Sequence, residues 1–389
     1  MTESIDVQAL GTRVRLRFAP GATAEWIGRV RGAWSGCGIP GSDEADATPD
    51  RTVEVPADGD PEWVLESLSV RVTLQALDHQ RGRMLLFHAA GIALDDGRVI
   101  AFVGPSGRGK TTLSRILGRH YAYVSDESVA VDAHLSVLPY RKPLSVVRAG
   151  RPKEQVSPEQ AGLRDLPDAA LRLAAVVFLD RRDEPCDPTV EPLPFTEVVR
   201  EIIPQMSFLR ELPRPLHALA QLGEQVGGFR RLRYSRVEDL VGIVDDVISG
   251  SDAAMTWRSV SVGPGARTDA AALDAGPDVG PDAGPAAGPA TPDAGPDAGP
   301  DAAAARIGPD VIDVIEVDGG LAVFSGGTIR VLEGIAPVLW ESAVAGRTSD
   351  EIVADVVARH GAPPDADPRA LVDAALAELV DAGVLSPNP

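Results

Sequence analysis

The sequence predicts an α/β domain at the start of the chain, a low-complexity linker, and a small α+β domain at the end. A short apolar run, a glycine-rich loop and an amphipathic helix follow one another over residues 99–117. Residues 263 to about 309 hold almost no large apolar side chain, and Gly-Pro-Asp units recur within them at 276–284 and 295–301. The patterns of short strands and helices then return. We therefore place the three parts at residues 1–250, 251–309 and 310–389.

Charge and composition restrict the classes of partner. The net charge is −20, and residues 263–389 hold twenty-one acidic residues against six arginines, a net −15. An acidic chain without a basic stripe argues against duplex DNA or RNA as a main partner. No apolar run approaches the length of a membrane span, and the first residues do not resemble a signal peptide. Two distant cysteines without metal-ligand spacing suit a reduced compartment, so we expect a cytoplasmic protein.

Residues 1–80 are expected to form an accessory part of the first domain. Residues 12–18 alternate between apolar side chains and arginines, which predicts an antiparallel strand with one buried face. A helix is expected around residues 24–34. Asp60-Pro61 supplies the cap and first turn of another helix. The buried face of that helix is expected to carry Leu65, Leu68, Val72 and Ala76.

Residues 104–112 read Gly-Pro-Ser-Gly-Arg-Gly-Lys-Thr-Thr and fit the phosphate-binding pattern G-x-x-x-x-G-K-[ST]. Its glycines let backbone N–H groups turn toward phosphate oxygens, and the helix that follows adds the positive end of its dipole. Lys110 is expected to reach the β- and γ-phosphates of ATP, and the Thr111 hydroxyl to bind Mg²⁺. The residues expected to hold the nucleotide are Gly104, Ser106, Gly107, Arg108, Gly109, Lys110, Thr111 and Thr112.

Lysine is rare in this chain, which has Lys110, Lys142 and Lys153 against thirty-four arginines. The retention of lysine in the loop indicates a need for a compact ammonium group that a planar guanidinium does not meet. Lys142 could contact the substrate or a phosphate, but a solvated surface position is the expectation for it.

Two acidic residues follow the loop helix. Asp126 and Glu127 lie within a strand predicted over residues 121–131. Phosphoryl transfer needs positioning, charge neutralisation and a base for the incoming hydroxyl. We expect Asp126 to be the base and Glu127 a ligand of Mg²⁺ or water, or the reverse, and both are candidate metal ligands together with Thr111. The alternative is a solvated turn without a role.

Two further residues are weaker candidates. His88 lies in a strand predicted over residues 85–93 and could polarise or protonate a group near the acidic pair. The alternative is a histidine satisfied in the core. Asp180 ends the apolar run at residues 174–179 and is a weaker candidate for the Mg²⁺ ligand. The alternative is the polar end of a strand.

The order of His88, the loop and the acidic pair resembles the HPr kinase/phosphorylase family. Residues 139–145, Pro-Tyr-Arg-Lys-Pro-Leu-Ser, resemble a segment of shorter HPr-kinase-like proteins from peptide-modification gene clusters. The resemblance covers residues 84–150 well and 150–250 loosely. Asp126-Glu127 replaces the usual pair of aspartates, and the family's glycine-rich signature is not visible after Ser145. The resemblance implies an ATP- and Mg²⁺-dependent kinase with a substrate other than HPr.

Residues 311–389 predict three short strands and three helices, the size of a winged-helix-like module. Four segments resemble the PqqD-like family: the strand run 311–332, Gly334-Ile335-Ala336 with Leu339-Trp340, Gly346-Arg347-Thr348 with Glu351-Ile352-Val353, and Leu379 to Leu385. That resemblance implies capture of a leader peptide as an added strand. The alternative is a winged-helix DNA binder, and the net charge of −9 over these residues argues against it.

Together with the loop, the two resemblances imply an ATP-dependent Ser/Thr kinase that acts on a ribosomally made precursor peptide. The C-terminal domain would hold the peptide, and a disordered linker would tether it near the active site. The alternative is a non-kinase ATP-binding switch or adaptor of a peptide-modification complex. An ABC-type ATPase is excluded because no Leu-Ser-Gly-Gly-Gln signature follows the loop. The acceptor residue, the peptide and a possible homo-oligomer stay open.

Overall fold

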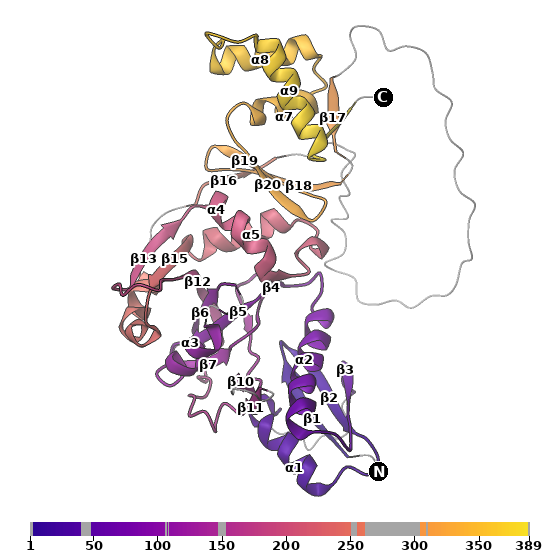
Figure 1. Ribbon diagram of the computed structural model, residues 1–389, viewed down its shortest axis with the longest axis vertical. Helices are drawn as coiled ribbons and strands as arrows, with labels where there is room; N and C mark the ends of the chain where they lie inside the picture. Colours follow the sequence, from indigo (N-terminus) through magenta and orange to yellow (C-terminus); the bar gives the residue numbers. More distant parts are fainter. Residues whose placement is uncertain are drawn as a thin grey trace, which may run out of the picture. The chain divides into compact units, whose positions relative to one another are not determined.

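The computed structural model describes residues 3–39, 48–105, 107, 109–146, 153–249, 255–260, 304–308 and 310–387. The chain divides into two compact units, Met1–Trp257 and Arg258–Pro389 (Figure 1). Most of the predicted disordered linker lies outside the described residues, as do Ser106 and Arg108 of the loop. No helix in the described ranges has both the length and the apolar character needed to cross a membrane.

The first unit begins with a three-stranded sheet and two helices. Its elements are β1 (Ser4–Ala9), β2 (Thr12–Phe18), β3 (Arg51–Val55), α1 (Ala24–Ala33) and α2 (Pro61–His79). β2 pairs antiparallel with β1 and parallel with β3. The Asp60 side chain caps α2 by accepting hydrogen bonds from two backbone N–H groups. The apolar face predicted for α2 is confirmed, because its four side chains are buried in the core beneath the helix.

A mixed six-stranded sheet forms the centre of the unit. Its strands are β5 (Ala89–Ala93), β6 (Arg98–Val103), β7 (Ala122–Ser125), β12 (Arg172–Arg181), β13 (Thr189–Leu193) and β15 (Phe229–Tyr234). Their order is β13-β15-β12-β6-β5-β7, and β12 runs parallel to both of its neighbours. α3 (Lys110–Leu117) follows β6, and its Leu113 and Leu117 pack into the core of this sheet. The predicted strand, loop and helix are therefore present.

A second, four-stranded sheet has the order β14-β4-β8-β9. Its strands are β4 (Leu85–Phe87), β8 (Val129–Val131), β9 (Val137–Leu138) and β14 (Met206–Ser207). Two strands of this sheet are next to strands of the central sheet in the chain. β4 is followed by β5 after a break at His88, and β7 is followed by β8 after a break at residues 126–128. The prediction of continuous strands over residues 85–93 and 121–131 is therefore wrong, because each of these segments passes from one sheet to the other at its break.

The remaining elements of the unit cover and connect these sheets. They are β10 (Leu144–Val146), β11 (Glu154–Val156), α4 (Phe195–Ile202), α5 (Pro215–Gln225), α6 (Val244–Ser249) and 3-10 turns at Ser35–Cys37, Ile203–Gln205, Leu209–Glu211 and Val237–Ile243. α4 packs on the central sheet through Phe195, whose ring centre lies 6.0 Å from that of Phe229 on β15. The 3-10 turn after α4 leads into β14, which brings residues 204–207 beside β4.

The second unit is a small α+β domain. Its elements are β16 (Trp257–Ser259), β17 (Ala305–Ile307), β18 (Val311–Val317), β19 (Gly320–Ser325), β20 (Thr328–Leu332), α7 (Ala336–Val344), α8 (Ser349–His360), α9 (Pro368–Asp381) and β21 (Leu385–Pro387). The sheets have the orders β16-β18-β19-β20 and β17-β21. The three predicted strands and three helices are confirmed. β16 and β17 lie within the range assigned to the linker, so that range also contains strands.

Candidate active site

The glycine-rich loop between β6 and α3 is shaped by its glycines. Gly107 and Gly109 have φ of 82° and 90°, in the left-handed region that favours glycine, and Gly109 is the N-cap of α3. A Cβ on Gly104 would lie 3.3 Å from the Leu179 Cβ, so the neighbouring strand leaves little room there. The backbone therefore turns sharply into the N-terminus of α3, where its N–H groups favour an anion.

Lys110 begins α3 and is almost fully buried. Its Nζ donates hydrogen bonds to the carbonyl oxygens of Gly104 and, at 3.3 Å, of Pro105. Burial lowers the pKa of Lys110 to about 8, although Glu127 and Asp126 oppose this shift. The amine is therefore protonated at neutral pH and places a positive charge inside the loop.

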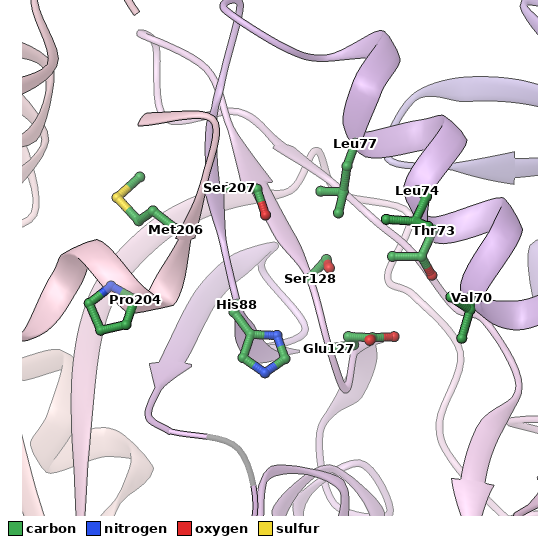
Figure 2. A pocket seen from close by; sticks show the side chains of 10 residues that line it. All are labelled: Val70, Thr73, Leu74, Leu77, His88, Glu127, Ser128, Pro204, Met206 and Ser207. Atoms are coloured by element: carbon green, nitrogen blue, oxygen red, sulfur yellow. The ribbon is translucent and has the colours of Figure 1, made fainter. Parts of the chain in front are cut away.

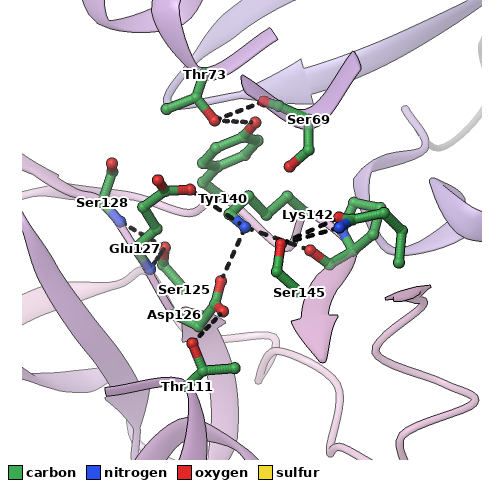
Figure 3. Close-up of polar contacts among 12 residues, drawn as sticks. Ser69, Thr73, Thr111, Ser125, Asp126, Glu127, Ser128, Tyr140, Lys142 and Ser145 are labelled. Atoms are coloured by element: carbon green, nitrogen blue, oxygen red, sulfur yellow. Dashed lines mark hydrogen bonds and ion pairs between the residues drawn. The ribbon is translucent and has the colours of Figure 1, made fainter. Parts of the chain in front are cut away.

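Asp126 connects this loop with the break after β7. The carboxylate is buried, and its Oδ2 accepts a hydrogen bond from the Thr111 hydroxyl at 3.1 Å (Figure 3). Its Oδ1 accepts one from the Tyr123 hydroxyl at 3.2 Å. A carboxylate beside a loop hydroxyl is a set of hard oxygen donors that suits Mg²⁺, which commonly takes one or two carboxylates and completes its shell with phosphate and water. Among the described residues, no three His, Cys, Asp or Glu side chains are arranged so that they could hold a metal ion by themselves.

Lys142 occupies the other side of the acidic pair. Its Nζ lies 3.3 Å from Asp126 Oδ1 and 3.2 Å from Glu127 Oε2, and the residue is 2% exposed. The expectation of a solvated surface lysine is therefore wrong. Burial by itself lowers the pKa of Lys142, but the two carboxylates outweigh it and raise that pKa above its usual value. The rarity of lysine in the chain was the one sequence signal of this role.

The Glu127 side chain lies on the side of the turn away from Thr111 (Figure 3). Its side chain is 40% exposed, whereas that of Asp126 is 2% exposed. The turn is held by the Ser125 hydroxyl, which accepts hydrogen bonds from the backbone N–H groups of Glu127 and Ser128. The Glu127 carbonyl accepts a hydrogen bond from the Ala89 N–H at 3.1 Å. The two strand breaks are therefore joined, and His88 is brought beside the acidic pair.

An open pocket of about 250 Å³ lies in front of Glu127 and His88 (Figure 2). Burial, and then the positive charge of Lys110, lower the pKa of His88, so its ring is neutral at pH 7. The rest of the wall comes from Ser128, from α2, and from the segment that contains Pro204, Met206 and Ser207. Sequence reasoning missed this wall because both segments are distant from the loop in the chain.

Asp180 and Thr112 are two further predicted residues that the structure describes. Asp180 Oδ2 pairs with Arg182 at 2.6 Å and with Arg233 at 3.4 Å, so arginines, rather than the Thr111 hydroxyl, hold this carboxylate. Thr112 is exposed in the first turn of α3. Ser106 and Arg108 lie outside the described residues.

The site therefore has two sides. One side combines the loop, Lys110, Thr111 and a buried carboxylate, which suits a phosphate chain with its metal ion. The other side presents an accessible carboxylate and a neutral imidazole to an open pocket, which suits removal of a proton from an incoming group. Lys142 contacts both members of the acidic pair and neutralises part of their charge.

Comparisons with known proteins add little to this geometry. No protein-family model matches the chain, and no curated protein matches it. One solved structure that resembles it is the HPr(Ser) kinase/phosphatase from Coxiella burnetii, at 16% sequence identity. The match covers 42% of this chain and 93% of that chain, with a TM-score of 0.25. A likeness this weak does not establish a family, so the assignment of function depends on the chain's own residues.

Proposed function

We propose that this protein transfers the γ-phosphoryl group of ATP to the hydroxyl of a serine or threonine in a polypeptide. The observation that carries the proposal is the division of the acidic pair. Asp126 contacts the loop hydroxyl of Thr111, whereas Glu127 faces the open pocket beside His88. The phosphoryl donor would thus bind on one side of this turn and the acceptor on the other.

On the nucleotide side, the loop N–H groups and Lys110 would bind the phosphates. Thr111 and Asp126 would hold Mg²⁺, which when bound supplies positive charge to the β- and γ-phosphates. The carboxylate of Glu127 would then act on the acceptor. Of the two role assignments that the sequence left open, the geometry supports Asp126 as the metal ligand and Glu127 as the base.

On the acceptor side, Glu127 would take the proton of the acceptor hydroxyl. The oxygen then forms a bond to the γ-phosphorus, the bond from that phosphorus to the β–γ bridging oxygen breaks, and ADP leaves with the electron pair. His88 would hold the acceptor oxygen or the transferred group by a hydrogen bond from its neutral ring. Lys142 would keep the two carboxylates in place by reducing their mutual repulsion.

The acceptor in this proposal is a ribosomally made precursor peptide captured by the second unit. The sheet there has β16 at one end and β20 at the other, so part of the chain already covers the outer edge of β18. A peptide strand would add to β20 through backbone hydrogen bonds. The PqqD-like character of this unit, the partner peptide and the cytoplasmic location remain predictions from sequence.

The test is incubation of the full chain with ATP, Mg²⁺ and peptides encoded beside its gene, followed by intact-mass analysis. A gain of one phosphate on a peptide supports the kinase. ADP release with an unmodified peptide supports instead the ATP-dependent switch. Lys110→Ala is the control: it should lose ATP binding in a titration, because the only ammonium group within the loop is removed, and unchanged affinity would contradict the nucleotide site.

A further inference from the structure

The exposed face of α2 is unusually apolar. Among the described residues four large hydrophobic side chains are exposed, and three of them lie on this helix: Trp63 at 61%, Val70 at 54% and Leu74 at 58%. The opposite face of α2 is buried in the core of the unit. The solvent face of such a helix normally carries charged and polar residues, so a second apolar face calls for a ligand or partner.

This face leads into the pocket beside Glu127. Val70, Thr73, Leu74 and Leu77 line the pocket with the spacing of one helical face. Figure 2 shows their side chains on one side of the pocket, with Glu127 and His88 nearby. Any group that fills the apolar part of the pocket therefore lies next to the residue proposed as the base.

The opposite wall is also largely apolar. It is formed by Pro204 and Met206, with the Ser207 hydroxyl beside them. Methionine is flexible and adapts to side chains of different shapes. The pocket thus offers two apolar walls and a polar floor, which suits one large apolar side chain next to a hydroxyl group.

The length of the apolar face indicates the class of ligand. Trp63 and Leu77 lie roughly 21 Å apart along the helix, at a rise of 1.5 Å per residue. A pocket of about 250 Å³ holds one side chain or a small molecule, but it does not account for exposed apolar groups over that length. An extended polypeptide covers the same distance with about six residues. The dimensions therefore favour a polypeptide over a small-molecule acceptor.

We propose that the α2 apolar face, defined as Trp63, Val70, Leu74 and Leu77, docks the acceptor polypeptide. The acceptor carries a large apolar side chain close to the phosphorylated serine or threonine, and that side chain enters the pocket. The inference rests on the proposed function, because it is the place of Glu127 that makes the pocket the acceptor side. It adds a sequence preference close to the phosphorylated residue.

The test uses two sets of short fluorescein-labelled peptides with one central serine. Each peptide carries a single leucine at one position near the serine, and its counterpart carries glutamine there. Binding to the full chain is measured by anisotropy, and phosphate transfer by intact mass. We expect the leucine peptides to bind at least about tenfold more tightly at one preferred position, the effect of burying one such side chain.

Leu74→Glu should remove this preference, and Val70→Glu should do the same. Leu371→Glu is the matched control, because Leu371 is a leucine exposed to a similar degree, at 47%, on α9 in the second unit. It should keep the preference. Thermal unfolding of each variant checks that the substitution has not disturbed folding.

The outcomes separate the two proposals. Equal binding of both peptide sets, or a preference that persists in both α2 variants, overturns the docking site. Transfer to both sets alike keeps the kinase and overturns the docking site. Preferential binding without any transfer keeps the docking site and overturns the kinase. If Leu74→Glu changes the oligomeric state of the protein in solution and Leu371→Glu does not, the apolar face is an interface between copies of this chain. That result also overturns the docking site.

Discussion

The Thr111 hydroxyl donates a hydrogen bond to Asp126 Oδ2 at 3.1 Å, and this contact joins the glycine-rich loop to the acidic pair. α3 packs against β5 and β7, which brings its first turn beside the break that follows β7. Glu127, the next residue in that break, lines the open pocket instead. One short turn thus serves both proposed sides of the reaction.

The first prediction separates the two carboxylates. Asp126→Asn should raise the Mg²⁺ concentration needed for half-maximal transfer by about 10- to 100-fold, because a metal ligand loses its charge. Glu127→Gln should leave this Mg²⁺ requirement near that of the unmodified protein and lower kcat by about 10²- to 10⁴-fold, because a base is lost. Initial rates measured over a range of Mg²⁺ concentrations give both quantities. Equal shifts of the Mg²⁺ requirement in the two variants would contradict the division of roles.

The second prediction concerns the buried ion pair. Lys142→Met should lower the free energy of unfolding by about 3–5 kcal/mol, because it leaves the buried Asp126 carboxylate without its cation. Most of the effect comes from Asp126, since the half-exposed Glu127 is screened by water. Urea unfolding at pH 7 measures the change.

The chain offers a matched control for that variant. Lys153 forms an ion pair with Glu66 at 3.6 Å, and its own side chain is 52% exposed. Lys153→Met should change the free energy of unfolding by less than about 1 kcal/mol. In addition, Asp126→Asn combined with Lys142→Met should cost less than the sum of the single changes, since the two groups interact. Strict additivity would show that they do not.

The third prediction tests the loop conformation. Gly109 has φ of 90°, and a Cβ there would lie 3.3 Å from the Arg181 Nη1. Gly109→Ala should cost about 1–2 kcal/mol of stability from the left-handed backbone and should weaken ATP binding. Gly162→Ala is the control, because Gly162 has φ of 69° with no atom within 4 Å of an added Cβ. Both should lose similar stability in thermal unfolding, but a comparable loss of ATP affinity in the Gly162 variant would refute a specific role for Gly109.

The fourth prediction concerns Cys37. Burial raises the pKa of this thiol from 9.0 to about 12, although Lys142 and Arg141 act in the other direction. Because the thiolate is the reactive form, Cys37 should not react with Ellman's reagent at pH 8 in the folded protein. Cys186 is only half-buried and should react. One thiol should therefore be detected before denaturation and two after it.

The same shift has a consequence for stability. The folded state favours the neutral thiol, so the contribution of Cys37 to stability is complete below pH 9 and is lost as the pH rises from about 9 to 12. Cys37→Ala should remove this part of the alkaline dependence when urea unfolding is followed at several pH values. An unchanged dependence in the variant would assign the alkaline loss to other groups.

The local features of the site could be predicted from the sequence. An apolar strand, a glycine-rich loop with Lys110 and Thr111, and a helix are encoded within about twenty residues and depend on neighbours in the chain. Residues 126 and 127 were also identified. The sequence did not predict that their side chains point in different directions, because this depends on a break at which the chain passes from one sheet to another. Both halves of each broken strand are apolar, so the pattern does not show the break.

Lys142 and the pocket illustrate the same limit. A lysine within a Pro-rich segment predicts exposure, and only the fold places two carboxylates around it. The inner face of α2 followed from helical periodicity, whereas the importance of its outer face depends on Pro204 and Met206, more than a hundred residues further along the chain.

The sequence by itself therefore determined the glycine-rich loop, the nearby acidic pair and the division into an α/β part and a small α+β part, because these depend on short-range patterns. The tertiary structure decided which carboxylate contacts the loop, which cation pairs with both carboxylates and which apolar face borders the pocket. Each of these is set by contacts between segments that are far apart in the chain, and residue periodicity carries no information about such contacts.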